Sequence, residues 1–178
     1  MNRWRGRISG LAILALVAAS FALGAVGLAV VGSGSPPAHA PEGDWQLVVR
    51  AANEDVLLRV PLPASRFSLR YRNSVYRSLA EERFSINPGG RMVLVELAAD
   101  EAAVLAEYYS AERPRPADPG DGRRWRARPS AGVTLDELSL VATEHGRRTL
   151  VIDGRAFPLW QLGGVGAPTV ILAAEKSR

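Results

Sequence analysis

The chain lacks cysteine altogether, and among its 178 residues lysine occurs once, as Lys176. Without thiols, disulfides, thiolate metal sites and a lipid on an amino-terminal cysteine are all excluded. Histidine is nearly as scarce, with only His39 and His145, so no pair at zinc-ligand spacing exists in the main domain. Stability must therefore come from packing, and the sequence predicts no metal site.

Motifs for catalysis or cofactor binding are missing as well. The sequence has no nucleophile elbow and no dinucleotide fingerprint, and the glycine-rich residues 163–166 precede an expected strand, whereas a phosphate loop precedes a helix. His145 stands between Glu144 and Gly146, which is typical of a turn. We therefore expect no cofactor, and the sequence favours a protein that is not an enzyme.

One long apolar run is present near the amino terminus. Residues 1–7 carry Arg3, Arg5 and Arg7, and residues 8–31 contain no charged side chain. As a helix these 24 residues would extend roughly 36 Å, enough to cross a hydrocarbon core of about 30 Å. The arginines before the run orient the amino terminus inward. We expect a transmembrane or signal helix that places the rest of the chain outside the cytoplasm.

A Gly/Ser/Pro-rich tether at residues 32–43 separates this run from a domain at residues 44–178. The tether contains Ala38, His39 and Ala40, which have the small-x-small form of a signal-peptidase site. Because the apolar run is longer than that of a signal peptide, we expect a retained single-pass anchor; secretion after cleavage near Ala40 is the alternative. The domain itself is nearly neutral, so nucleic acid is not an expected partner.

The domain shows the period-two alternation of half-buried strands. Turn residues separate these segments, including Asn87 to Gly90 and the Asp153-Gly154 pair that favours a type I′ hairpin. Strands are predicted at residues 45–49, 56–60, 67–71, 84–86, 92–97, 138–142, 150–152, 155–160 and 169–173. We expect an all-β fold, mainly an antiparallel sandwich or a partly open barrel.

Two segments depart from the strand pattern. Residues 98–109 are alanine-rich, begin with Asp100 and Glu101, and predict one short helix. Residues 112–130 contain several prolines and glycines and predict a long exposed loop. Its arginines suit anionic groups such as lipid headgroups, although the acidic residues among them favour a merely solvated loop. These arginines are Arg113, Arg115, Arg123, Arg124, Arg126 and Arg128.

Polar residues interrupt two neighbouring strand patterns. Tyr71, Asn73, Ser74 and Glu82 could converge into a small polar site if the residues between them form a hairpin. The alternative is a turn in which Asn73 and Ser74 bond to local backbone while Glu82 pairs with a surface arginine. Arg70 and Arg72, on the same strand, provide a further possibility, which is that the domain binds a small anion.

The same stretch resembles the domain-of-unknown-function 1850 family. Tyr71, residues 73–75, Glu82 and Phe84 match its most recognisable block, except that the family's histidine is Asn73 here. Members are small exported or membrane-anchored proteins, often encoded beside tripartite transporters of the TAXI type. The resemblance implies a transporter component as a partner and assigns no mechanism.

The sequence therefore predicts an extracytoplasmic, membrane-anchored accessory or binding module linked to solute transport. Small-anion binding is one alternative. A hydrolase that uses Ser74 and Glu82 is the other, and it would require a polar site at the hairpin.

Overall fold

The computed structural model describes residues 45–109, 111–162 and 169–177. Within these residues, no helix is long and apolar enough to cross a membrane. The expected anchor at residues 8–31 and the tether at residues 32–43 lie outside the described residues.

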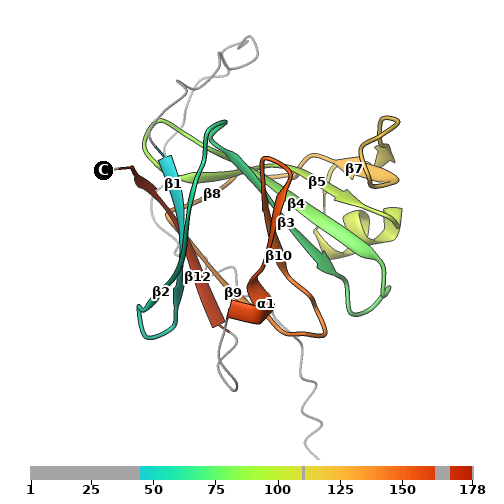
Figure 1. Cartoon of the computed structure of the whole chain (residues 1–178). Coiled ribbons are helices and arrows are strands. Elements are labelled where there is room, and N and C mark those ends of the chain that lie inside the picture. The colour runs from blue at the N-terminus through green and yellow to red at the C-terminus, as the bar shows by residue number, and fades with distance from the viewer. Residues whose placement is uncertain (1–44, 110, 163–168, 178) are drawn as a thin grey trace, which may run out of the picture. The chain divides into compact units, whose positions relative to one another are not determined.

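Two antiparallel sheets make up the described domain (Figure 1). The first is four-stranded, and its central pair runs from Trp45 opposite Lys176 to Ala51 opposite Val170. Apolar residues at alternate positions, such as Leu47 and Val49, turn one face of this sheet toward the core. In sheet order its strands are β2 (Val56–Pro61), β1 (Trp45–Ala51), β12 (Thr169–Lys176) and β9 (Glu137–Val141).

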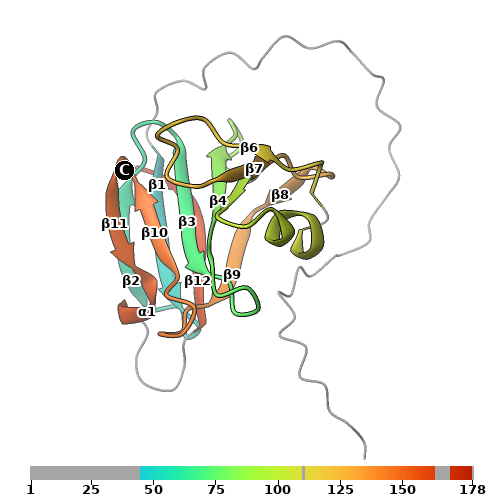
Figure 2. The ribbon, with the colours of Figure 1, turned by 90° about the vertical axis from the view of Figure 1, so that its right-hand side faces the viewer.

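The second sheet has eight strands and lies in front of the first in Figure 2. Its central strands β3, β4 and β5 are joined consecutively along the chain, as a meander. In sheet order the strands are β11 (Arg155–Pro158), β10 (Thr149–Ile152), β3 (Arg66–Arg72), β4 (Leu79–Ile86), β5 (Met92–Ala99), β7 (Trp125–Ala127) and β6 (Arg115–Pro116), and β8 (Val133–Leu135) also pairs with β5. The all-β, antiparallel prediction is confirmed.

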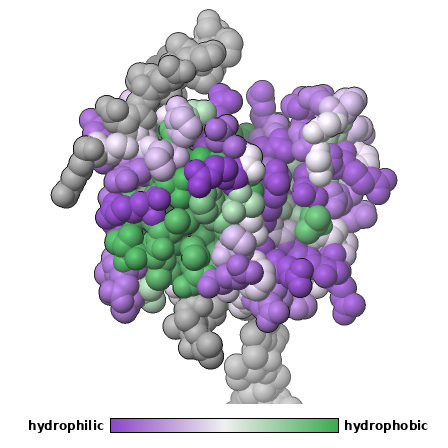
Figure 3. Space-filling model, viewed as in Figure 1, coloured by the Kyte–Doolittle hydropathy of each residue, from purple (hydrophilic) through white to green (hydrophobic). Residues whose placement is uncertain are grey.

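Apolar side chains from both sheets share one core cluster. Leu47 and Leu172 of the first sheet belong to it together with Leu69 and Leu150 of the second, and all four are fully buried. Phe67 stacks on Phe84 with ring centroids 5.0 Å apart. In Figure 3 the apolar surface gathers on the side of the molecule that carries β1, β2 and β12.

A second, smaller cluster lies beside β5 and involves the helical segment η1 (Val104–Tyr108). Val104 and Leu105 are fully buried there against Leu97 of β5 and Ala127 of β7. This segment corrects the bounds of the helix expected at residues 98–109, because strand β5 continues through Ala99 and the helical residues are only 102–108, of which 104–108 form a π-helical turn. Alanines at the end of β5 are fully buried and pair with β7, which removes them from the helix.

Two other expectations need correction. The loop expected at residues 112–130 contains β6 and β7, because Trp125 and its neighbours extend the sheet beyond β5. The strand expected at residues 155–160 ends at Pro158, and α1 (Leu159–Leu162) follows, so the described residues contain two short helical segments where one was predicted. Asp153 and Gly154 both adopt positive φ, as a type I′ hairpin requires.

Candidate functional site

The outward face of the second sheet carries arginines from strand β3. Phe67, Leu69 and Tyr71 are buried on the inner face, so Arg70 and Arg72 project outward by the period of two. Arg70 stands between Thr149 of β10 and Glu81 of β4 in the strand register. The sheet thus places residues from three strands side by side on one exposed face.

Glu81 is the centre of an ion-pair network on this face. Glu81 is only 4% exposed, and its carboxylate accepts hydrogen bonds from Arg70 Nε at 2.9 Å and Arg83 Nε at 3.3 Å. Arg123 Nε lies 3.9 Å from the same carboxylate, and Arg123 also bonds Asp100. A buried carboxylate needs such partners, because an unpaired charge in this position would be strongly destabilising.

Arg83 extends the network toward the loop before β7. Its guanidinium donates to Asp121 at 2.6 and 2.9 Å and to Glu96 at 2.6 Å. The hydrogen bond to Asp121 raises the pKa of Arg83, and the hydrogen bond from Arg83 lowers the pKa of Asp121. Both groups therefore stay charged at neutral pH.

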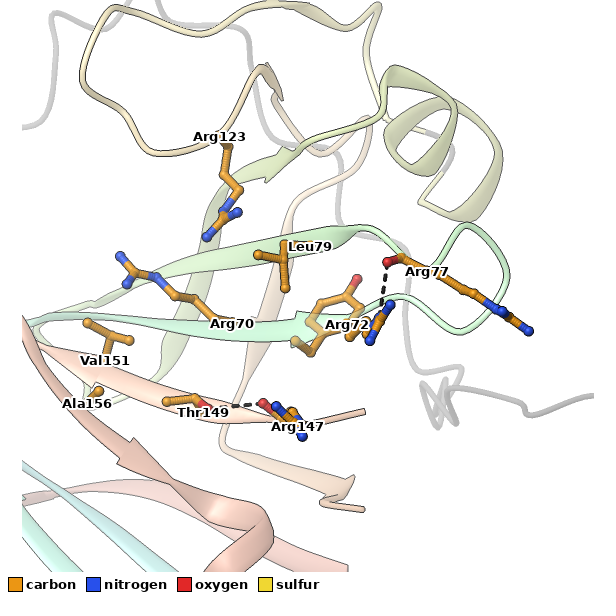
Figure 4. A pocket seen from close by; sticks show the side chains of 10 residues that line it. Arg70, Arg72, Arg77, Leu79, Arg123, Arg147, Thr149, Val151 and Ala156 are labelled. Carbon is orange, nitrogen blue, oxygen red and sulfur yellow. Dashed lines mark hydrogen bonds between the residues drawn. The ribbon is translucent and has the colours of Figure 1, made fainter. Parts of the chain in front are cut away.

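A hollow of about 490 Å³ opens beside this network (Figure 4). Val151 and Ala156 lie at one end of it, and Arg72 and Arg147 lie at the other. Leu79, the first residue of β4, is the register partner of Arg72 and also lines the hollow. The complete lining is Arg70, Tyr71, Arg72, Arg77, Leu79, Arg123, Arg147, Thr149, Val151 and Ala156.

We call Arg72 and Arg147 the arginine pair. In the part of the chain that the structure describes, neither of them forms an ion pair with a carboxylate. Arg72 Nε donates to the Arg77 carbonyl at 3.1 Å, and the Arg147 guanidinium carbon lies 5.8 Å from the centroid of the Trp160 ring. The Arg77 side chain points away from the hollow in Figure 4. Two guanidinium groups that form no ion pair within the described residues make this the cationic end of the hollow.

A second hollow, of about 330 Å³, adjoins the arginine pair. Glu144 and His145 line it together with Arg72 and Arg147. The turn expected around His145 is present, since Gly146 N donates to Thr143 Oγ1 at 3.2 Å and Arg147 N donates to the Thr143 carbonyl at 2.9 Å. This turn fixes the backbone position from which the Arg147 side chain extends.

Asn73 holds the hairpin loop between β3 and β4. Its Oδ1 accepts hydrogen bonds from the backbone N–H groups of Val75 at 3.0 Å and Tyr76 at 2.9 Å, and its own N–H donates to the Ser78 carbonyl at 2.8 Å. Asn73 is 2% exposed, whereas Ser74 is exposed. The arrangement is that of an Asx turn, in which the amide organises local backbone.

Glu82 faces the opposite side of the sheet from Glu81. It lies across from Leu69 in the register, and its Oε1 accepts a 2.5 Å hydrogen bond from Tyr109 Oη. Tyr109 Oη also bonds Tyr71 Oη, and burial together with the Glu82 charge raises the pKa of Tyr109 well above its usual range. The Arg148 guanidinium carbon lies 4.9 Å from the centroid of the Tyr71 ring.

Three of the six residues predicted for a site, Arg70, Tyr71 and Arg72, line the hollow. The other three do not line it, since Asn73 and Ser74 belong to the hairpin loop and Glu82 bonds Tyr109 on the covered face. Of the arginine run at residues 113–128, only Arg123 lines it.

Sequence reasoning missed the part of the hollow that β10 and its flanking residues supply. Arg147, Thr149 and Val151 alternate along the chain, which is the available signal that they share a face. The pairing of β10 with β3 joins positions about eighty residues apart, and alternation within a strand carries no information on its partner.

Comparisons of the chain with protein-family models, with curated proteins and with solved structures found no match. The resemblance to the domain-of-unknown-function 1850 family stays a prediction.

Proposed function

We propose that this protein is an extracytoplasmic binding domain for a small anion, tethered to the membrane by its amino-terminal segment. The observation that carries the proposal is the arginine pair at one end of the hollow. Arg72 ends β3, Arg147 lies in the turn just before β10, and neither forms an ion pair within the described residues. Guanidinium groups bind carboxylates and phosphates through paired, charge-assisted hydrogen bonds.

The size of the hollow supports the proposal. Small-molecule sites in proteins typically measure about 300–1,000 Å³, and the hollow holds about 490 Å³. The Glu81 network beside it fixes Arg70 and Arg123, because each guanidinium has a carboxylate partner. A ligand would therefore meet a wall that is already ordered, which lowers the entropic cost of binding.

Location and partners come from the sequence. The apolar residues 8–31 would hold the domain at the outer surface of the membrane, with a transporter component as the partner that the family resemblance implies. An anion-binding accessory domain in that position would deliver or sense a solute. An antiparallel sandwich with the site on one outer sheet face is the architecture we assign to it.

The positions of Ser74 and Glu82 do not support the hydrolase alternative. Ser74 lies exposed on the hairpin loop, and the Glu82 carboxylate bonds Tyr109 on the covered face of the sheet. A nucleophile and its base need to lie within hydrogen-bond reach of each other, and these residues belong to different sides of the structure.

Thermal unfolding of the full-length protein in neutral detergent tests the proposal. Phosphate, sulfate, acetate and hexanoate would be added separately at constant ionic strength. A ligand at 100 times its Kd stabilises the folded state by about 2.7 kcal/mol, which raises the midpoint by several degrees. We expect at least one of these anions to raise it.

The double variant Arg72→Gln/Arg147→Gln should lose that rise. Arg66→Gln is the matched control, since Arg66 is an exposed arginine on the same strand that does not line the hollow. The proposal is wrong if no anion stabilises the wild type, or if the double variant responds as the wild type does.

A further inference from the structure

We infer that the ligand is an amphipathic organic anion, with one anionic group for the arginine pair and an apolar body that lies along the sheet. This inference rests on the proposed anion-binding function and specifies its ligand class. It starts from the unequal ends of the hollow, which are cationic at Arg72 and Arg147 and apolar at Val151 and Ala156.

Apolar side chains line the hollow at both ends. Leu79, the first residue of β4 and the register partner of Arg72, is 45% exposed, so a large aliphatic side chain lies beside the arginine pair. Val151 and Ala156 are direct partners in the β10–β11 register and line the other end, where Val151 is largely buried and Ala156 is exposed. An inorganic ion would leave this surface in water, whereas an apolar ligand body would remove it from water at a gain of about 25 cal/mol per Å².

The charges in the middle of the hollow are already neutralised by the protein. Arg70 and Arg123 face Glu81, and Thr149 Oγ1 donates to the Arg147 carbonyl at 3.0 Å, although Arg123 Nε is buried without a hydrogen bond. Because each guanidinium has a carboxylate nearby, an apolar segment can lie over them without leaving a charge unpaired. A second anionic group in this position would instead approach the Glu81 carboxylate.

The distance between the two ends sets the length of the ligand. Val151 is the third residue of β10 and Arg147 lies in the turn just before this strand, so four residues at about 3.3 Å each give an upper bound of roughly 13 Å between the two backbones. A short acyl or aryl chain with a terminal carboxylate fits this length. The ligand class is therefore a monoanionic organic acid with a medium-length apolar body.

Calorimetric titration of the full-length protein, held in nanodiscs of zwitterionic lipid, compares acetate with hexanoate. Empty nanodiscs serve as the blank for partitioning of the acid into lipid. The two acids share a carboxylate and differ by four methylene groups, so partial burial of those groups predicts about tenfold tighter binding of hexanoate. Leu79→Ala should reduce this preference severalfold, measured as the ratio of the hexanoate and acetate affinities.

Two further variants make the titration decisive. Ala156→Asp, at an exposed position, places a carboxylate at the apolar end and should weaken hexanoate more than acetate. Val141→Ala removes an exposed apolar side chain of β9 outside the hollow and should change neither affinity.

Equal affinities for acetate and hexanoate in the wild type would overturn the inference while leaving anion binding intact. If Arg72→Gln/Arg147→Gln binds both acids as the wild type does, the proposed function itself falls. The two failures are thus distinguishable in one series of titrations.

Discussion

At the scale of single residues, neighbouring carboxylates have opposite surroundings. Glu81 faces outward into the arginine network and Glu82 faces inward to Tyr109, because successive residues of a strand point to opposite faces. The sequence pattern drew attention to Glu82, yet the carboxylate beside the hollow is Glu81. Its role depends on Arg70, Arg83 and Arg123, and the last of these joins it only through tertiary pairing. Local reasoning succeeded better at Asn73, whose turn role was one of two alternatives.

Asp121 offers a prediction at this scale. Replacing it with asparagine removes the carboxylate that binds Arg83 in two places, and we expect a loss of about 1–2 kcal/mol of unfolding free energy at pH 7. The pKa of Asp121 is lowered in the folded protein, so its stabilisation is present above the unfolded value of 3.8 and disappears as pH falls through the folded pKa. The difference between wild type and variant should therefore shrink below about pH 4.

Thermal midpoints at pH 7, 5 and 3 measure this effect. Asp136→Asn is the control, because the Arg91–Asp136 pair is solvent-exposed and contributes about 0–1 kcal/mol. A constant difference at all three pH values would show that Asp121 acts through packing and not through its charge.

At the scale of elements, the η1 segment is held to the second sheet by a short chain of hydroxyl and carboxylate bonds. Tyr109 connects Glu82 of β4 and Tyr71 of β3, just beyond the end of η1. Val104 and Leu105 add fully buried apolar contacts. The alanine-rich composition predicted a helix here, but the predicted start of the helix was wrong because Ala98 and Ala99 pair with β7 as part of strand β5. Propensity alone does not weigh that tertiary contact.

Tyr109→Phe tests the anchoring of this element. The substitution keeps the ring and leaves the Glu82 carboxylate without its tyrosine donor, so we expect a loss of about 1–3 kcal/mol of unfolding free energy. Hydrogen exchange at residues 104–108 should accelerate more than exchange in β12. Tyr76→Phe is the comparison, since Tyr76 Oη bonds Glu107 at an exposed position. Equal effects of the two variants would contradict a specific role for Tyr109.

At the scale of the whole molecule, alternation in the sequence predicted most strands and the antiparallel class. It did not predict which strands share a sheet, because the pairings of β1 with β12 and of β10 with β3 join distant segments. The short strands β6 and β7 were missed for a related reason. They lie in a proline- and arginine-rich stretch and form strands only because β5 provides an edge.

We also predict that the whole chain is anchored in the membrane. Expression of the full-length protein with a carboxy-terminal tag should give the uncleaved mass in the membrane pellet, because residues 8–31 are long enough to span the bilayer. Fractionation followed by mass spectrometry measures both properties together. A product that begins near Pro41 in the soluble exported fraction would contradict the anchor and identify a secreted domain.

The difference between the arginines that form ion pairs and the two that form none beside the hollow has a consequence for how the protein can diverge. Arg70 and Arg83 are tied to buried or partly buried carboxylates, so their replacement damages the fold. Arg72 and Arg147 form no ion pair with a carboxylate within the described residues, so substitutions there leave the contacts of the core unchanged. Substitutions at these two positions can therefore alter ligand preference with little effect on stability, whereas substitutions at Arg70 or Arg83 disturb the ion-pair network.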